Sequence, residues 1–134
     1  MAADVIVVDA SIVYEVVAQG VHRDIALSTL LMHGDVVTPA IVDAEVLGII
    51  KRDRYRALLD DTAADLAVND LLAWPAERFS ITPLVERVWN LRANVRVWDA
   101  FYVALAEALD APVVTMDQRL ARAMGPRCEF ITVP

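Results

Sequence analysis

The fold is decided by the stretch Val95–Asp117, which reads Val-Arg-Val-Trp-Asp-Ala-Phe-Tyr-Val-Ala-Leu-Ala-Glu-Ala-Leu-Asp-Ala-Pro-Val-Val-Thr-Met-Asp. Residues Asp99–Leu109 are apolar at almost every position, which predicts a helix that is buried on all sides and has an aspartate in its first turn. Pro112 ends this helix, and Val113–Met116 predicts a short strand buried in a parallel sheet and followed by Asp117. Two acidic residues therefore lie at the ends of consecutive elements.

A second strand that ends at an acidic residue lies near the amino terminus. Val5–Val8 is a continuous apolar run, Asp9 follows it directly, and a helix is predicted over about residues 11–19. Further strands are predicted at 36–37, 79–81 and 130–133, and further helices at 22–33, 40–52, 55–59, 62–74, 84–92 and 118–124. This alternation predicts an α/β domain with a short central parallel sheet and helices on both faces. Ligands of such sheets bind at the carboxyl ends of the strands, where Asp9 and Asp117 would lie.

A fourth acidic residue, Glu45, lies within a predicted apolar helix face. At 100° per residue, its side chain falls between Ile41 and Ile49. Burying a lone carboxylate costs several kcal/mol, so Glu45 should either reach solvent at the rim of this face or have a cationic partner.

Composition indicates one domain over residues 1–134. The chain is 57% hydrophobic, which is ample for a core. No apolar run approaches the ~20 residues that span a bilayer, and Met1–Val8 is too short and too acidic for a secretory signal, so we expect a cytoplasmic protein without a membrane partner. The single cysteine, Cys128, agrees with a reducing compartment. The leucines of residues 58–72 would supply a core face or a dimer face.

The net charge of −7 counts against binding of nucleic acid by bulk attraction. If four of the acids hold a metal ion, 15 acidic and 12 basic residues remain, and the net charge of the rest of the protein is only −3. The argument against nucleic acid is then weaker. Eleven of the basic residues are arginine, which either reflects bidentate phosphate binding or a GC-rich genome.

The acids Asp9, Glu45, Asp99 and Asp117 are best explained together. Each aspartate alone could be a helix N-cap. Gathered in one place, however, two carboxylates ~4 Å apart repel by ~4 kcal/mol at an effective dielectric near 20, and a divalent cation removes this repulsion. A carboxylate site without histidine or cysteine favours Mg²⁺ or Mn²⁺. Such an ion activates water for attack on a phosphodiester, and the sequence offers no paired nucleophile for a covalent route.

Four motifs, in this order along nearly the whole chain, resemble the PIN-domain ribonucleases and in particular the VapC toxins. They are Val-Val-Asp9-Ala-Ser11, Glu45 in its helix, Asn94-Val-Arg-Val-Trp-Asp99-Ala-Phe-Tyr-Val-Ala-Leu-Ala, and Val-Val-Thr115-Met-Asp117-Gln-Arg-Leu-Ala-Arg-Ala. The resemblance implies a PIN-like fold and an endoribonuclease that depends on Mg²⁺ or Mn²⁺ and cuts structured RNA such as tRNA. It also implies a homodimer and a cognate VapB-type antitoxin.

The resemblance assigns roles to individual residues. The family's acidic quartet falls on Asp9, Glu45, Asp99 and Asp117, and the hydroxyls of Ser11 and Thr115 would fix these carboxylates. We expect Arg96, Lys51 and Arg52 to contact the RNA, although the basic run at 51–56 is also typical of a solvated helix end.

Three other interpretations remain at this stage. A response-regulator receiver would have paired acids after its first strand and a lysine late in the chain, whereas Asp9 stands alone and Lys51 is the only lysine. A dehalogenase-type metal-dependent phosphatase would have Asp-x-Asp, and Ser11 occupies that second place. A non-catalytic α/β regulatory domain would use its aspartates only as helix caps and would gain no stability from Mg²⁺.

Overall fold

The computed structural model describes residues 4–134, so the start of the Met1–Val8 segment lies outside the described residues. The chain forms a five-stranded sheet in the order β3-β2-β1-β4-β5, and every described strand pair is parallel. The strands are β1 (Val5–Val8), β2 (Asp35–Pro39), β3 (Glu77–Phe79), β4 (Val113–Thr115) and β5 (Phe130–Thr132). The predicted parallel α/β sheet is confirmed.

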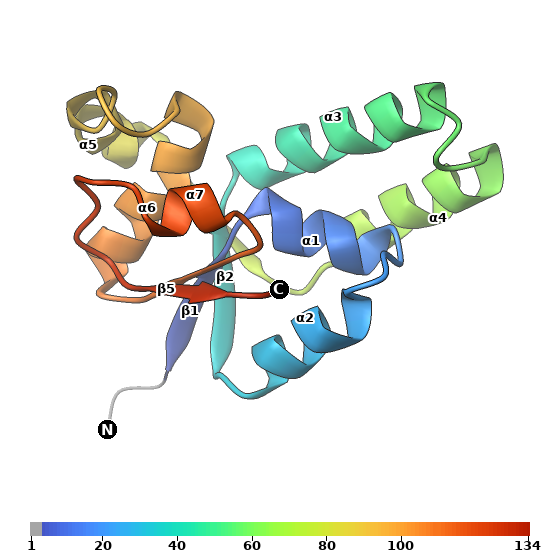
Figure 1. The fold of residues 1–134 in the computed structure, drawn as a ribbon, viewed down its shortest axis with the longest axis horizontal. Coiled ribbons are helices and arrows are strands. Elements are labelled where there is room, and N and C mark those ends of the chain that lie inside the picture. Colours follow the sequence, from blue (N-terminus) through green and yellow to red (C-terminus); the bar gives the residue numbers. More distant parts are fainter. Residues whose placement is uncertain (1–3) are drawn as a thin grey trace.

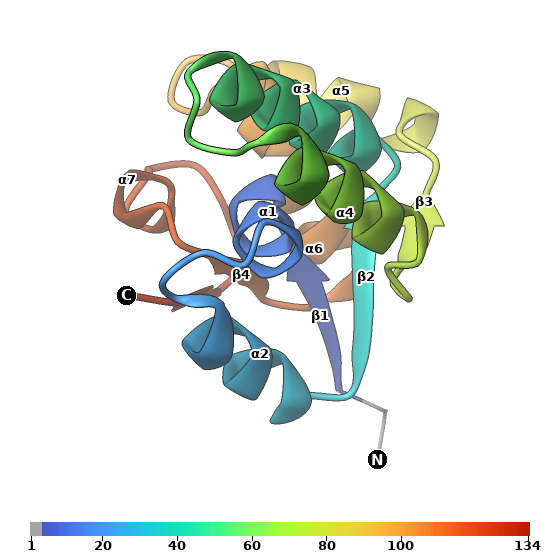
Figure 2. The same ribbon diagram turned by 90° about the vertical axis from the view of Figure 1, so that its right-hand side faces the viewer.

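Helices cover both faces of this sheet. They are α1 (Ala10–Val17), α2 (Arg23–Leu31), α3 (Ile41–Tyr55), α4 (Asp61–Leu72), α5 (Val85–Asn90, after the 3-10 turn Thr82–Leu84), α6 (Val97–Leu109) and α7 (Gln118–Ala121). Helix α6 packs against β1, β2 and β4. Figures 1 and 2 show α1 on the opposite face of the sheet from α6, with α3 and α4 extending beyond α1.

The core is centred on β1, β4 and α6. Ile6, Val7 and Val8 of β1 are at most 1% exposed, and all residues from Ala100 to Ala106 are buried. The prediction of a helix buried on all sides over residues 99–109 is therefore confirmed for Ala100–Ala106, whereas Ala108 and Leu109 at its end are exposed. The helix ends at Asp110, which adopts the left-handed conformation at φ +52°, and Pro112 follows it before β4.

The predicted helix at 55–59 is wrong. Helix α3 continues to Tyr55, and the chain then turns, with the amides of Leu58 and Leu59 donating to the Asp53 carbonyl. The leucines of this region also differ from a core face, because Leu58, Leu66 and Leu72 are 69%, 52% and 80% exposed. The α3–α4 pair projects from the body (Figure 1), so only one face of α4, formed by Ala64, Ala67 and Leu71, is buried.

Among the described residues, no helix has both the length and the apolar character needed to cross a membrane.

Candidate active site

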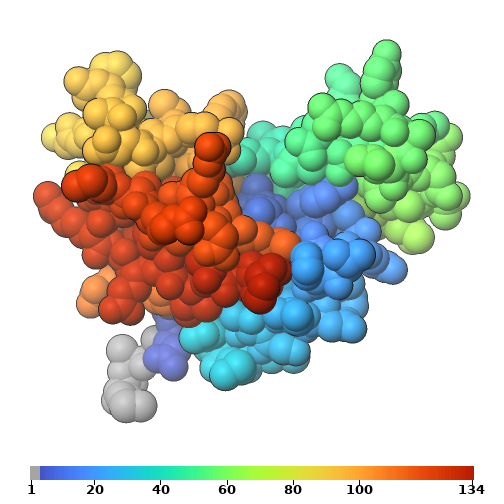
Figure 3. Space-filling model, viewed as in Figure 1, coloured from blue at the N-terminus to red at the C-terminus, as the bar shows by residue number. Residues whose placement is uncertain are grey.

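The acidic residues lie where the strand order reverses. Strand β1 is flanked by β2 on one side and β4 on the other, and in open α/β sheets this switch point is the usual ligand site. Asp9 directly follows β1, and Asp117 lies two residues after β4. Figure 3 shows the surface hollowed between α3–α4 (green) and the segment that leads into α6 (yellow to orange), with α1 (blue) in the depression.

Asp9 is the most deeply buried of the four acids, with 5% of its surface exposed. Its Oδ1 accepts hydrogen bonds from the Ser11 hydroxyl at 2.5 Å and the Ile12 amide at 3.3 Å, and its Oδ2 accepts one from the Thr115 hydroxyl. Burial raises the pKa of Asp9 to about 6; these hydrogen bonds lower it, and the Asp99 charge raises it. The carboxylate is well oriented, but its charge is costly in this environment.

The two hydroxyls join Asp9 to the segment after β4. Ser11 Oγ accepts a hydrogen bond from the Met116 amide at 3.1 Å, and Thr115 Oγ1 accepts one from the Asp117 amide at 2.9 Å. Each hydroxyl donates to Asp9 and accepts from the backbone, so its proton has a fixed direction. Ser11 and Thr115 thus lie beside a predicted site carboxylate, as the sequence predicted.

Two of the aspartates do cap helices. Asp9 is the N-cap of α1, and Asp117 is the N-cap of α7, where its Oδ1 accepts from the amides of Arg119 (2.9 Å) and Leu120 (3.1 Å). Both bonds of Asp117 end on Oδ1, so they leave Oδ2 free for another ligand. Asp99 is different, because it lies inside the first turn of α6, after the N-cap residue. Helix capping therefore explains why aspartate occurs at positions 9 and 117, but it does not explain Asp99.

Glu45 and Tyr102 bring an unusual pair of buried oxygens to this edge. Glu45 Oε1 and the Tyr102 hydroxyl oxygen are both buried, and within residues 4–134 neither makes a well-formed hydrogen bond, although the Tyr102 hydroxyl lies close enough to the Glu45 carboxylate to stabilise its charge. Burial raises the pKa of Glu45, the nearby Tyr102 hydroxyl lowers it, and the charges of Asp99 and Asp9 raise it. Burial and the Glu45 charge raise the pKa of Tyr102. A buried oxygen without a partner is typical of a site that binds an ion or water.

Arg96 is the cation among these acids. Its Nε donates to Asp99 Oδ2 at 3.1 Å, and the Arg96 side chain is 78% exposed, whereas that of Asp99 is 17% exposed. The Asp99 hydrogen bond raises the pKa of Arg96, and the charges of Asp99, Asp117 and Glu45 raise it further. Arg96 therefore lies within the electrostatic influence of three of the four acids.

The four acids share one region, but they do not form a closed ligand set. In the part of the chain that the structure describes, no three Asp, Glu, His or Cys side chains are grouped so that they could hold a metal ion. Asp99 is already hydrogen-bonded to Arg96, and Asp9 and Asp117 accept hydrogen bonds from the first turns of the helices that they cap. The exposed Arg96 side chain would have to leave Asp99 before that carboxylate could bind an ion. The chemistry of these donors suits a hard divalent ion, since all of them are carboxylate oxygens.

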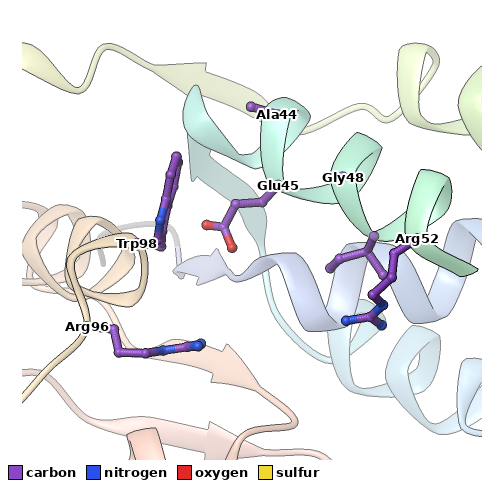
Figure 4. Close-up of a pocket in the computed structure, with 7 residues that line it drawn as sticks. Ala44, Glu45, Gly48, Arg52, Arg96 and Trp98 are labelled. Atoms are coloured by element: carbon purple, nitrogen blue, oxygen red, sulfur yellow. The ribbon is translucent and has the colours of Figure 1, made fainter.

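Two pockets adjoin the acidic cluster, and Arg96 lines both. The first, of about 320 Å³, is lined by Ala44, Glu45, Gly48, Ile49, Arg52, Arg96 and Trp98 (Figure 4). The second, of about 300 Å³, includes Asp99, Asp117 and Arg119. Of the three predicted RNA contacts, Arg96 and Arg52 line these pockets, whereas Lys51 is exposed on α3 and lines neither.

Sequence reasoning missed Tyr102, Trp98 and Arg119. Tyr102 follows Asp99 by three residues in one helix, so helical spacing alone could have placed the two side chains on one face. Trp98 and Arg119 gave no such signal, because their position depends on how α3, α6 and α7 pack.

The fold and its acidic edge place the protein among the parallel α/β domains that carry carboxylates at a strand-order switch point. Residues 6–125 match the PIN domain family. Ribonuclease VapC1 of Mycobacterium tuberculosis is 39% identical over 128 residues, which cover 95% of this chain and 96% of that protein. Ribonuclease VapC12 of the same species is 35% identical over 125 residues, which cover 93% and 96%.

The chain belongs to the PIN-domain family and, within it, to the VapC ribonucleases. A solved structure supports the fold: VapBC2 from Rickettsia felis, bound to a DNA fragment from their promoter, has a TM-score of 0.68 at 14% identity, covering 96% of this chain and 98% of that one. The family resemblance predicted from the sequence is confirmed, which favours a nuclease over the receiver, phosphatase and regulatory interpretations.

Proposed function

We propose that the protein is the toxin of a type II toxin-antitoxin pair, an endoribonuclease that uses Mg²⁺ or Mn²⁺ to hydrolyse phosphodiester bonds of structured RNA such as tRNA. The observation that carries this proposal is the proximity of two buried carboxylates, Asp9, which two hydroxyls orient, and Glu45, which makes no well-formed hydrogen bond within the described residues. Relatives with the name ribonuclease support the reaction class. The protein would act in the cytoplasm.

The carboxylates of Asp9, Asp99 and Asp117 would hold the ion directly or through water, and Glu45 would bind it or orient the attacking water. When bound, a divalent ion supplies an activated water and neutralises the phosphate oxygens. Ser11 and Thr115 keep the Asp9 carboxylate in one orientation, which limits the rearrangement needed to bind.

Arginines would bind the RNA. Arg96 would exchange its bond to Asp99 for a phosphate oxygen, and Arg52 would contact the strand from α3, with exposed Lys51 as a more distant contact. The guanidinium group suits this task because it can bind a phosphate through two parallel hydrogen bonds.

The chemistry is tested by sequencing both ends of RNA cleaved by the purified protein. Attack by water without the ribose 2′-hydroxyl predicts 5′-phosphate and 3′-hydroxyl ends. Asp9→Asn and Asp99→Asn should abolish cleavage, while Asp24→Asn, on the exposed surface of α2, should leave it unchanged. Cyclic-phosphate ends, or cleavage that persists in excess EDTA, would contradict the mechanism.

The partners are tested separately. We propose a homodimer and neutralisation by a VapB-type antitoxin, in analogy to VapBC2 of Rickettsia felis, which was solved bound to a DNA fragment from their promoter. Light scattering should give twice the chain mass, and co-expression with the product of an adjacent small gene should relieve growth inhibition. A monomer, or inhibition that no adjacent gene relieves, would contradict these assignments.

A further inference from the structure

The pocket between α3 and the start of α6 has properties that metal binding does not explain. One helix face supplies most of it, since Glu45, Gly48, Ile49 and Arg52 follow the i, i+3, i+4, i+7 spacing of a single side of α3. Trp98 and Arg96 form the opposite side (Figure 4). The pocket thus combines an apolar wall with two guanidinium groups, directly beside the acidic cluster.

Trp98 is the largest side chain of this wall. It is 52% exposed, although the seven residues from Ala100 to Ala106 of the same helix are all buried. In Figure 4 its ring stands opposite Glu45, on the other side of the pocket from α3. An exposed tryptophan beside a hollow offers a flat surface for another ring, and protein aromatics stack on unpaired bases in this way.

Gly48 gives the pocket its space. A glycine in a helix interior destabilises the helix relative to alanine, and such a residue often allows a close approach of another chain segment. Here a Cβ at position 48 would meet no atom within 4 Å, so the protein itself does not require glycine. The missing side chain instead leaves the surface of α3 open opposite Trp98.

The two arginines of the pocket can bind a phosphate, although Glu45 also lines it, because each arginine uses only its Nε in its bond to an aspartate. Arg52 Nε is bound to Asp53 at 3.0 Å, and Asp53 also accepts a hydrogen bond from Tyr14 of α1. This anchoring at Nε limits the positions of the Arg52 guanidinium, and its terminal nitrogens are not used by that bond. Arg96 lies at the boundary between the pocket and the acidic cluster. A nucleotide whose base lies in the pocket would therefore have its phosphate between two arginines.

We propose that this pocket binds one unpaired base of the RNA, adjacent to the phosphodiester that is cut, with the base stacked on Trp98 in the space left by Gly48. The inference rests on the proposed ribonuclease function and adds a base-recognition subsite to it. Arg52 and Arg96 then bind the flanking phosphates, which brings the scissile bond to the acids.

Binding is tested without cleavage, by titrating the ¹⁵N-labelled protein in EDTA with adenosine and uridine 5′-monophosphates. At least one nucleotide should shift the indole N–H signal of Trp98, while ribose 5-phosphate, which lacks a base, should not. Trp98→Ala should weaken nucleotide binding by roughly 5- to 150-fold, the range expected for loss of one base–aromatic stack. Trp89→Ala is the matched control, because Trp89 is also exposed, at 60%, but lies on α5 outside the pocket.

Position 48 gives an independent test. Gly48→Leu should block the pocket and abolish the nucleotide shifts, and because a side chain there meets open space, thermal unfolding should show an intact fold. Gly48→Ala, which adds only a methyl group, should bind better than Gly48→Leu.

Cleavage of a randomised RNA pool provides the second readout. The wild type should show a preference for one base beside the cut, and Trp98→Ala should lose it while Trp89→Ala retains it. An unchanged base preference in Trp98→Ala, together with unchanged nucleotide binding, would overturn the subsite and leave the ribonuclease proposal intact.

Absence of cleavage by the wild type would overturn the proposed function. The nucleotide titration would still show whether the pocket binds a base. A Trp98 shift caused by the antitoxin and by no nucleotide would assign the pocket to a protein.

Discussion

Replacing Asp9 with asparagine should stabilise the metal-free protein at neutral pH. Burial raises the pKa of Asp9 from 3.8 to about 6, and two units correspond to about 3 kcal/mol at 1.36 kcal/mol per unit. For an acid whose pKa is raised in the folded state, the favourable contribution is fully present below about pH 3.8 and is lost as the pH rises through about 6. At neutral pH the charged Asp9 therefore lowers the free energy of unfolding.

Asparagine removes this charge and keeps an oxygen that accepts from Ser11 and Ile12, but its amide group cannot accept from the buried Thr115 hydroxyl, whose proton then loses its partner. In EDTA at neutral pH, removing the charge contributes about 3 kcal/mol and the unpaired Thr115 hydroxyl costs about 1–2 kcal/mol, so we expect Asp9→Asn to be about 1–2 kcal/mol more stable than the wild type in urea unfolding. The melting temperature should rise by roughly 5 °C, and this advantage should disappear as the pH falls toward about 4.

Mg²⁺ should reverse the order of the two proteins. At 100 times its Kd, the ion stabilises the wild type by about 2.7 kcal/mol, and Asp9→Asn should gain much less. Asp24→Asn, at a fully solvated carboxylate, is the control for loss of one negative charge. The reasoning is refuted if Asp9→Asn is less stable than the wild type in EDTA and gains as much from Mg²⁺.

Three further substitutions test one contact of the site and two contacts that join elements of the fold. Thr115→Val removes the hydroxyl that donates to Asp9, so Mg²⁺ affinity measured by calorimetry should fall about 10-fold or more. Tyr14→Phe removes the hydrogen bond from α1 to Asp53 and should cost about 1–2 kcal/mol in urea unfolding. Arg78→Met leaves the carbonyls of residues 71, 74 and 76 without their guanidinium donor and should cost about 2–4 kcal/mol in the same assay.

Each of these variants has an exposed counterpart. Thr132→Val on β5, Tyr55→Phe at the end of α3 and Arg92→Met after α5 remove the same groups from the surface. We expect each to change its measurement little. A site variant that behaves like its counterpart would show that the contact contributes nothing measurable.

The sheet and the placement of its acids could be predicted because the signals are local. Val5–Val8 and Val113–Thr115 are β-branched at every position and apolar except at Thr115, so the sequence alone predicts these two strands and the acids that follow them. Because β1 and β4 pair in parallel, Asp9 and Asp117 then lie at the same edge of the sheet, and no other feature of the sequence is needed to predict this.

The rest of the site depends on distances between helices that sequence patterns do not encode. Glu45 and Arg96 lie 51 positions apart, and whether the carboxylate finds a partner depends on how α3 packs against the start of α6. The sequence left open a rim position or a cationic partner for Glu45. The structure instead gives a buried Glu45 carboxylate beside the Tyr102 hydroxyl, and an arginine that is bound to Asp99.

The exposed leucines show the same limit. Leu66 and Leu72 have the spacing and character of core residues, but α4 projects with α3 and buries only a narrow face. Hydrophobic pattern predicts which residues could be buried, and the tertiary arrangement decides which are.

The account depends on the acids gathering around one cation, and anomalous scattering from a crystal grown in Mn²⁺ tests this most directly. We predict one peak at about 2 Å from carboxylate oxygens of Asp9 and Asp99, with Glu45 and Asp117 facing it directly or through water and Arg96 turned away. Saturating Mn²⁺ with no peak at this edge, and with the Arg96–Asp99 bond intact, would contradict it.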